Sequence, residues 1–427
     1  MFRVGYGPVE IEENLSFLSD MLSMTRTYFE KFLRLRCAAF ALIGLMWIIC
    51  MSLPVRADAE TNTNEISVPA GIYPGLDYFL ALVDPAGKTA FDPQMVGSVL
   101  DFIETPKKED AIYFANRISG LTSAYYELDI DTSLEKLAGY SFNADIPAIA
   151  TMPSSARLFQ WVDAGGQRQA PPRAAQGHAE PGTPLVWRGF QYLEITPDLT
   201  SGAYYAYKSR HTLLFFSYRR RKVIVSVARQ ADVSTVGEKG YILGVDNDWD
   251  YYYSDKTGLT LPALGWVRSY MYDSGGINVY YEVDPGAPRV RCAMFKWLRA
   301  GWSKINMVQK KHIYEGLKRF AVPLKEILEH PGLPSVAMMA DDFSRITELS
   351  DATLISRMEI YSKLLGNRYA TGKQRTQKWP FDLFENKNHW RQMSREEMES
   401  ALVIEYMKYA LGKSRLEEVR EFLGLNR

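Results

Sequence analysis

Between residues 185 and 302, apolar and polar positions alternate with the period of two that is typical of β-strands. Apolar residues share one strand face in three such runs: Val223, Val225 and Val227; Ile277, Val279, Tyr281 and Val283; Tyr241, Leu243 and Val245. Segments rich in Asp, Gly, Pro, Ser or Arg separate the runs and predict turns at 196–202, 219–222, 254–258, 273–276 and 284–288. About seven or eight strands fit here, which predicts a curved antiparallel sheet or half-barrel.

From residue 303 onward, the apolar period changes to that of a helix. Apolar residues recur three and four positions apart at Ile313, Leu317, Phe320, Leu324, Ile327 and Leu328. Pro323 falls within this pattern and predicts either a kink or the start of a second helix. Further on, Ser394 and Glu397 have the spacing of a capping box, which marks the start of another helix. The segment 303–427 is therefore predicted to be a helical region that packs on the sheet.

The segment before the β-region has a mixed pattern. Residues 93–104 and 107–118 are predicted to be helices, 124–130 a strand and 132–137 a short helix. Residues 163–184 contain no large apolar side chain and are rich in Pro, Gly, Ala and Gln, which predicts a flexible linker or a long surface loop. The whole pattern predicts an α+β fold with a small mixed N-terminal domain (60–162), a linker (163–184), an antiparallel β-domain (185–302) and a helical part (303–427).

Residues 24–59 have the three parts of a bacterial export signal. A basic segment that begins at Met24 precedes an uncharged run over 37–53, and Ala57 and Ala59 are the small residues that a signal peptidase recognises. We therefore expect a start at Met24, with residues 1–23 as an extension, cleavage after Ala59 and a periplasmic or secreted mature protein. Alternatively, the run over 37–53 stays uncleaved as an inner-membrane anchor, since its 17 residues approach the ~20 of a spanning helix.

Charge and cysteine content narrow the partners and the compartment. The chain has 50 basic and 50 acidic residues and stays neutral without residues 1–59, which hold six of each. A neutral chain offers no electrostatic attraction for nucleic acid and little for anionic lipid surfaces, so we expect membrane contact only through 37–53. Cys37 and Cys50 leave with the signal, which excludes an intramolecular disulfide. Cys292 alternates with apolar neighbours and is expected to be buried and structural.

The β-region contains more aromatic residues than one face of a sheet needs. Successive tyrosines at 251–253 place rings on both faces of a strand. Packing in the core explains many of these rings, but amphipathic rings also suit a pocket for a lipid, an acyl chain or a glycan. The predicted ligand-binding residues are Tyr205, Tyr207, Trp249, Tyr251, Tyr253, Trp266 and Tyr270.

Asp246, Asp248 and Asp250 have the spacing of the first three ligands in a calcium loop. Tyr251 stands where an EF-hand needs Gly, and Thr257 stands where it needs Glu, so an EF-hand is excluded. A looser Ca²⁺ site at the three aspartates is the one metal hypothesis, and no other cofactor is expected. The alternative is a strand whose aspartates face solvent.

No motif in the sequence forms a complete catalytic set. The stretch Asp273-Ser274-Gly275-Gly276 is similar to the region around the nucleophilic serine of chymotrypsin-like proteases. However, Tyr272 stands where that family has Gly, and the stretch is expected to form a hairpin turn. The five histidines show no metal-ligand spacing. No catalytic residue is therefore predicted.

These observations predict a non-catalytic exported envelope protein that binds an apolar or amphipathic ligand, such as a lipid or acyl chain, in a groove between sheet and helices. The first alternative is an exported hydrolase. Its candidate carboxylates are Asp246, Asp248, Asp250 and Asp255, because two convergent carboxylates can divide acid and base roles. The second alternative is an envelope assembly or scaffold protein that contacts an envelope partner through its helical part.

Overall fold

The computed structural model describes residues 64–83, 90–109, 111–116, 118–167, 169, 183–196, 204–236, 242–253, 259–261, 265–371 and 389–424. The chain divides into two compact units, residues 1–63 and residues 64–427, and every element below belongs to the second unit. The predicted export signal lies outside the described residues, and so do residues 170–182 of the predicted linker.

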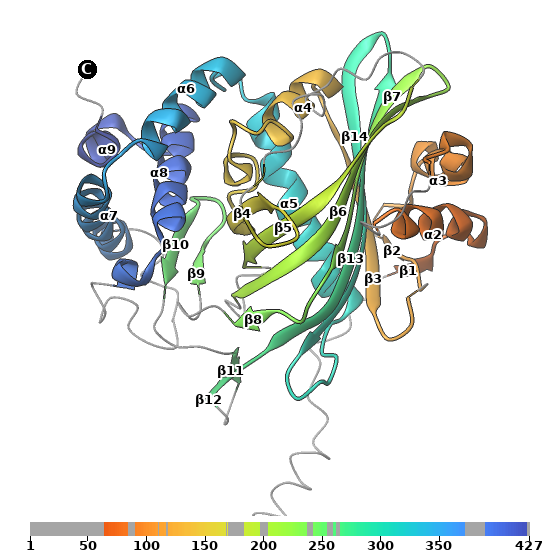
Figure 1. The fold of residues 1–427 in the computed structure, drawn as a ribbon, viewed down its shortest axis with the longest axis horizontal. Coiled ribbons are helices and arrows are strands. Elements are labelled where there is room, and N and C mark those ends of the chain that lie inside the picture. The colour runs from red at the N-terminus through yellow and green to blue at the C-terminus, as the bar shows by residue number, and fades with distance from the viewer. Residues whose placement is uncertain are drawn as a thin grey trace, which may run out of the picture. The chain divides into compact units, whose positions relative to one another are not determined.

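A sheet of ten strands forms the centre of the second unit (Figure 1). Its strands are β1 (Asn64–Ser67), β2 (Ala111–Phe114), β3 (Thr122–Ile130), β4 (Ala156–Val162), β5 (Leu185–Ile195), β6 (Tyr205–Tyr218), β7 (Arg221–Gln230), β8 (Thr235–Val236), β13 (Tyr270–Asp284) and β14 (Ala287–Gly301). Their order is β1-β2-β3-β14-β13-β7-β6-β5-β4, and β8 pairs with β6. All pairings are antiparallel except that of β1 with β2. The predicted α+β class with a curved antiparallel sheet is thus confirmed.

The segment predicted as a separate N-terminal domain contributes strands to both edges of this sheet. Residues 64–162 supply β1, β2 and β3 beside β14, and they supply β4 at the opposite edge beside β5. The strand predicted at 124–130 is confirmed as part of β3, and the helix predicted over 93–104 is confirmed as the 3-10 turn η2 (Pro93–Val96) followed by α3 (Gly97–Glu104). The sheet is therefore continuous across the predicted boundary between 60–162 and 185–302.

The helices lie in separate groups on the two faces of the sheet (Figure 1). Helices α2 (Tyr73–Ala81) and α3 cover one face. On the other side lie α4 (Leu134–Ser141), α5 (Lys310–Glu329), α6 (Val336–Thr347) and α8 (Arg395–Ala410), and α7 (Asp351–Thr371) and α9 (Leu416–Leu423) pack against α8. Shorter 3-10 turns are η1 (Ala70–Ile72), η3 (Ala148–Ala150) and η6 (His389–Gln392), and separate two-stranded sheets pair β9 (Ile242–Val245) with β10 (Asp250–Tyr253) and β11 (Leu259–Leu261) with β12 (Gly265–Val267).

Local sequence rules explain several boundaries of these elements. At the β6–β7 hairpin, Arg219 and Arg220 have φ values of 48° and 66°, the left-handed backbone that a tight two-residue turn requires. This confirms the turn predicted at 219–222. The capping box at Ser394 and Glu397 is present at the start of α8. Helix α5 continues through Pro323 to Glu329, so no second helix begins at the proline.

Two predictions of secondary structure were wrong. Residues 107–118 were expected to form a helix, but β2 occupies 111–114 and pairs with β1 and β3. The turn expected at 273–276 lies inside β13, where Gly275 pairs with Trp297 on one side and Arg229 on the other. In both cases pairing with a strand on each side outweighs the local preference, because the neighbouring strands satisfy the backbone hydrogen bonds.

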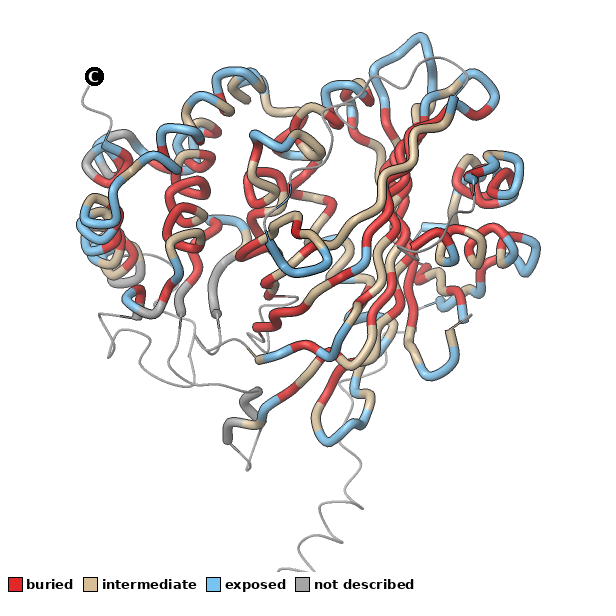
Figure 2. The backbone as a smooth tube through the Cα atoms, in the orientation of Figure 1, coloured by how far each residue is buried: buried red, intermediate tan, exposed pale blue. Residues whose placement is uncertain are grey.

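The two faces of the sheet belong to different hydrophobic cores. On the face toward α2 and α3, here called the α2–α3 face, the core is continuous and includes Val225, Val279 and Trp297. The face toward α5, here called the cavity face, joins the larger core, which reaches into α6–α9. Buried residues accordingly run along the central strands and along α8 (Figure 2). The predicted inward face of α5 is confirmed, since Ile313, Leu324, Ile327 and Leu328 are buried.

Candidate functional site: a cavity between the sheet and the helices

A cavity of about 1000 Å³ lies between the cavity face of the sheet and the helices over it. Its walls come from β4–β7, β13 and β14 on one side, and from α5, α6, α8 and the segment 141–152 on the other. Apolar side chains from both walls face it, among them Ile149, Leu158, Met294, Leu317, Phe320 and Phe343. Pockets that hold small ligands measure about 300–1000 Å³, so the volume is large enough for a ligand of considerable size.

One row of residues across the sheet explains why the space stays unfilled. Cross-strand pairing aligns Gly189, His211, Ala228, Gly276 and Lys296 on five successive strands. Three of the five have at most a methyl side chain. The ring of Trp187 covers Gly189, where an added Cβ would lie 2.7 Å from the indole, but Ala228 and Gly276 line the cavity. Small residues in the middle of central strands thus leave room above the sheet.

Aromatic rings close the cavity toward β4 and β5. Trp161 meets the ring of Trp187 edge-on, with centroids 4.2 Å apart, and the imidazole of His211 lies 4.7 Å from the Trp161 ring. Such edge-to-face pairs hold rings in fixed orientations. The ring of Trp161 also packs against the imidazole of His211.

His211 is a buried and neutral histidine on that floor. Its side chain is only 6% exposed, and burial lowers its pKa to about 3. The Nε2 atom is 2.8 Å from Ser226 Oγ, whereas Nδ1 has no hydrogen-bond partner among the described residues. A buried ring nitrogen without a hydrogen-bond partner costs free energy. His211 Nδ1 could therefore form a hydrogen bond with a ligand in the cavity.

Lys296 brings a cation to the same floor. Among the described residues that line the cavity, it is the only lysine or arginine. Its side chain extends over β13, since a Cβ placed on Gly276 would lie 3.6 Å from Lys296 Cδ and 4.0 Å from Nζ. Burial lowers the pKa of Lys296 to about 8, and the carboxylate of Asp273 acts weakly in the opposite direction. The ammonium therefore keeps its charge at neutral pH at an energetic cost.

Two tyrosines complete the sheet side of the cavity. Burial raises the pKa of Tyr207 to about 12 and raises that of Tyr280 well above its usual value. Both hydroxyl groups consequently remain protonated at neutral pH and keep their hydrogen-bond donors. On the helix side, Glu399 of α8 lines the cavity and pairs with Arg395 Nε at 2.9 Å.

The predicted ligand-binding aromatics are dispersed over several environments. Tyr207 lines the cavity. Tyr205 belongs to a small core with Met271, and its hydroxyl is 2.8 Å from Ser269 Oγ. Trp249 and Tyr251 are buried in the core beneath the helices, outside the walls of the cavity. Tyr270 packs beside Tyr272 at 6.4 Å between ring centroids. The side chains of Tyr253 and Trp266 lie outside the described residues.

Two of the three predicted metal-binding aspartates form ion pairs with different cations. Asp246 accepts hydrogen bonds from Arg319 Nε at 2.6 Å and from Tyr251 Oη at 2.8 Å. Asp248 is exposed, whereas Asp250 is buried. No group of three or more His, Cys, Asp or Glu residues in the described part of the chain is arranged to hold a metal ion. The calcium site stays a prediction, although Arg319 binds Asp246 and both Arg368 and Lys408 bind Asp250. Asp255 lies outside the described residues.

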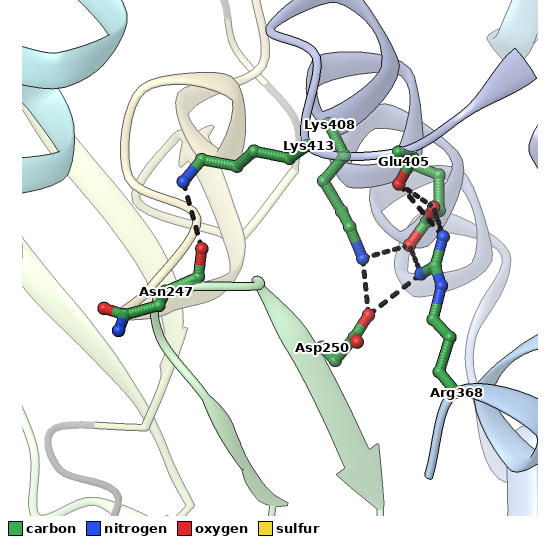
Figure 3. Close-up of polar contacts among 7 residues, drawn as sticks. Asn247, Asp250, Arg368, Glu405, Lys408 and Lys413 are labelled. Carbon is green, nitrogen blue, oxygen red and sulfur yellow. Dashed lines mark hydrogen bonds and ion pairs between the residues drawn. The ribbon is translucent and has the colours of Figure 1, made fainter. Parts of the chain in front are cut away.

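Asp250 instead belongs to a buried charge cluster (Figure 3). Arg368 of α7 donates to Asp250 at 2.9 Å and to both oxygens of Glu405 at 2.9 and 3.1 Å. Lys408 of α8 binds both carboxylates as well, and it lies 2.9 Å from Glu405. These bonds join β10 to α7 and α8. The pairing of two carboxylates with two cations explains a structural role and leaves no carboxylate available for acid–base chemistry here.

Cys292 has the buried position that its sequence context predicts. It lies in the core on the cavity face of β14, and burial raises the pKa of its thiol to about 12. A thiol with so little thiolate is unreactive, so Cys292 is a packing residue.

Sequence reasoning missed the polar residues of the cavity floor: His211, Ser226, Asn278 and Lys296. A signal for them was present, since each occupies the alternate positions of a strand whose other face is apolar. Ser226 stands between Val225 and Val227, for example. Such alternation is normally interpreted as a solvent-facing side of a sheet. The helices of the C-terminal segment, which is distant in sequence, enclose that side of the sheet.

No protein-family model and no curated protein sequence matches the chain. Among solved structures, it is similar to human STARD10, with 8% sequence identity and a TM-score of 0.25 over 62% of this chain and 85% of STARD10. A likeness this weak carries no argument about function. In the part of the chain that the structure describes, no helix has the length and apolar character needed to cross a membrane.

Proposed function

We propose that this protein is a non-catalytic binding protein that holds an apolar or amphipathic ligand in the cavity between its sheet and its helices. The observation that carries the proposal is the cavity itself, with a volume of about 1000 Å³ and side chains from two walls around it. A fold that needed only stability would fill this space, because close packing of the interior is worth several kcal/mol. The small residues Gly276 and Ala228 on the cavity floor are consistent with selection for an open cavity.

The site lacks the features that an enzyme of the obvious classes would need. Ser226 and His211 are within hydrogen-bond distance, which is the geometry of a nucleophile and its base. However, a histidine with a pKa of about 3 is too weak a base at neutral pH, and no described residue orients its Nδ1. The alternative of a carboxylate hydrolase is weakened, because two of its candidate carboxylates, Asp246 and Asp250, form ion pairs with arginines. Binding therefore explains the cavity better than hydrolysis does.

Export to the bacterial envelope remains part of the proposal on the strength of residues 24–59 alone. Fractionation of cells that produce the full chain tests it. A mature form that starts after Ala59 in the periplasm or the medium would support export with cleavage. A full-length form in the inner-membrane fraction would support the anchored alternative, and a full-length cytoplasmic form would refute both.

Native mass spectrometry of the full chain, isolated without detergent from the cells that produce it, tests the binding function. The expected result is one co-purifying amphiphile per protein. Ala228→Phe, which places a ring in the cavity, should abolish the bound mass, whereas Ala337→Phe on the exposed side of α6 should retain it. The proposal is refuted if the wild-type protein carries nothing and also binds neither an added fatty acid nor the corresponding fatty alcohol.

For the enzymatic alternative, Ser226→Ala is the decisive variant. Hydrolysis of ester substrates by the wild-type protein that disappears in Ser226→Ala would replace the binding proposal with a hydrolase. Equal background rates in both proteins support binding without turnover.

A further inference from the structure

The surroundings of Lys296 offer its charge no partner on the sheet. Met294 and Leu298 flank it along β14 on the same face, and Gly276 and Ala124 face it across the two neighbouring strands. None of these four side chains can accept a hydrogen bond. Among the described residues, none forms a hydrogen bond or ion pair with the Lys296 ammonium. Lys296 is half-buried, so an opposite charge that joined it in the cavity would stabilise it.

The acidic groups nearby are engaged or lie on another wall. Asp273, whose carboxylate attracts Lys296 from a distance, forms an ion pair with Arg229 at 3.0 Å. Glu399 pairs with Arg395 at 2.9 Å on the helix wall, where Glu396 and Asp145 also line the cavity. The sheet wall thus combines one cation with no anion of its own.

Neutral hydrogen-bonding groups accompany the cation on the cavity floor. His211 shares the row of Lys296, with Ala228 and Gly276 between them. Ser226 and Asn278 pair with each other in the next row on the same face. His211 is more than nine-tenths buried, lines the cavity and has an Nδ1 atom without a partner. A cation beside several neutral polar groups is a common arrangement for binding a compact anionic group.

We infer that the ligand of this cavity is a single-chain amphiphile with one carboxylate head group, which Lys296 Nζ binds on the sheet wall while the chain lies against Leu317, Phe320 and Phe343. This inference rests on the proposed binding function and adds the chemical class and the orientation of the ligand. One cation neutralises one negative charge, so the site favours a long-chain carboxylate over an uncharged amphiphile of equal length. A zwitterionic head group would need an additional anion beside Lys296, and that wall has none.

Binding of two matched probes, oleate and oleyl alcohol, to the delipidated full chain tests the inference by calorimetry or by displacement of a fluorescent fatty acid. The wild-type protein should bind oleate at least about 10-fold more tightly, which is typical of one charge-assisted contact in a site shielded from water. Lys296→Met should weaken oleate binding by about 10- to 100-fold and leave oleyl alcohol unchanged. Lys296→Arg, which keeps the charge, should retain the preference for oleate.

Lys318→Met on the exposed side of α5 is the matched control and should bind both probes as the wild-type protein does. Lys296→Gln provides a second neutral variant if the methionine variant fails to fold. The inference is overturned if the wild-type protein binds the alcohol as tightly as the acid, or if neutral variants keep the preference for oleate. In either case the proposed function would stand. Binding of neither probe would overturn the function and the inference together.

Discussion

The two faces of the central sheet differ sharply, although alternate residues of the same strands form both. On the α2–α3 face, β7, β13 and β14 present Val225, Val227, Ile277, Val279, Phe295 and Trp297. On the cavity face, the same strands present Ser226, Ala228, Gly276, Asn278, Met294 and Lys296. The first set fills its space with branched and aromatic side chains. The second set is smaller and more polar and leaves a cavity of about 1000 Å³. Because successive residues of a strand point to opposite faces, one set of positions packs the core and the other lines the cavity.

Truncation of the packed face should have the largest effect. Trp297 is fully buried, stacks on Phe295 and donates from Nε1 to the carbonyl oxygen of Ala115 at 2.8 Å. Trp297→Ala is therefore expected to lower the free energy of unfolding by about 3–5 kcal/mol, as measured by urea denaturation. Asn278→Ala on the cavity face should cost less than about 1 kcal/mol. Equal losses in the two variants would mean that the faces are packed alike.

The charge cluster formed by Asp250, Arg368, Glu405 and Lys408 allows paired charges to be compared with the unpaired charge of Lys296. Lys408 is 2% exposed and serves both Asp250 and Glu405. Lys408→Met leaves two buried carboxylates to share Arg368, and we expect a loss of about 3 kcal/mol in thermal or urea unfolding. As the control, Lys363→Met on the exposed side of α7 should change stability by no more than about 0.5 kcal/mol. Unchanged stability in Lys408→Met would refute the structural role of the cluster.

His211 should make the cavity face sensitive to acid. Its pKa is about 3 in the folded protein against 6.5 for the free side chain, so the unfolded chain binds the proton more readily. The contribution of neutral His211 is complete above about pH 6.5, and it is lost as the pH falls toward 3. Between pH 7.5 and 5.5 the loss should be about 1 kcal/mol. His211→Gln removes this part of the pH dependence, and identical pH profiles for the two proteins in urea denaturation would contradict the prediction.

Lys296→Met should give a small effect on stability, in the opposite direction from the truncations. In the protein without ligand, replacing the half-buried, unpaired ammonium of Lys296 by an apolar chain of similar length is expected to raise the free energy of unfolding by about 1 kcal/mol at pH 7. Because the folded pKa of Lys296 is lowered to about 8, the wild-type protein should gain stability as the pH rises above 8, and the gap to the variant should narrow. A less stable variant would indicate that a protein group neutralises Lys296.

The difference between the faces also explains which predictions from sequence succeeded. Alternation in 223–227 and 277–283 correctly indicated strands with one apolar face, because residues two apart always share a face. The apolar face of α5 was also predictable, because apolar residues recur three and four positions apart and such residues share one side of a helix. In contrast, Gly275 and Gly276 have the local preference of a turn, and their place in the middle of β13 depends on pairing with β7 and β14.

The candidate site was predictable only in outline. A groove between sheet and helices was expected from the order of elements, and Tyr207 was among the predicted residues that line the cavity. The dense tyrosines and tryptophans near 249–253 were a weaker guide, since Trp249 and Tyr251 pack in the core. Aromatic residues serve packing and binding equally well, so their number does not distinguish a filled core from a cavity.

By itself, the sequence determined the α+β class, the strand faces, the inward side of α5 and the burial of Cys292, because these depend on the spacing of neighbouring residues along one element. Tertiary structure alone decided that β1–β4 complete the same sheet, that Asp250 pairs with Lys408, and that Lys296 and His211 share the floor of one cavity. Those relations join residues far apart along the chain, by 158 positions in the Asp250–Lys408 pair. Strand register and helix placement set them, and no local pattern encodes either.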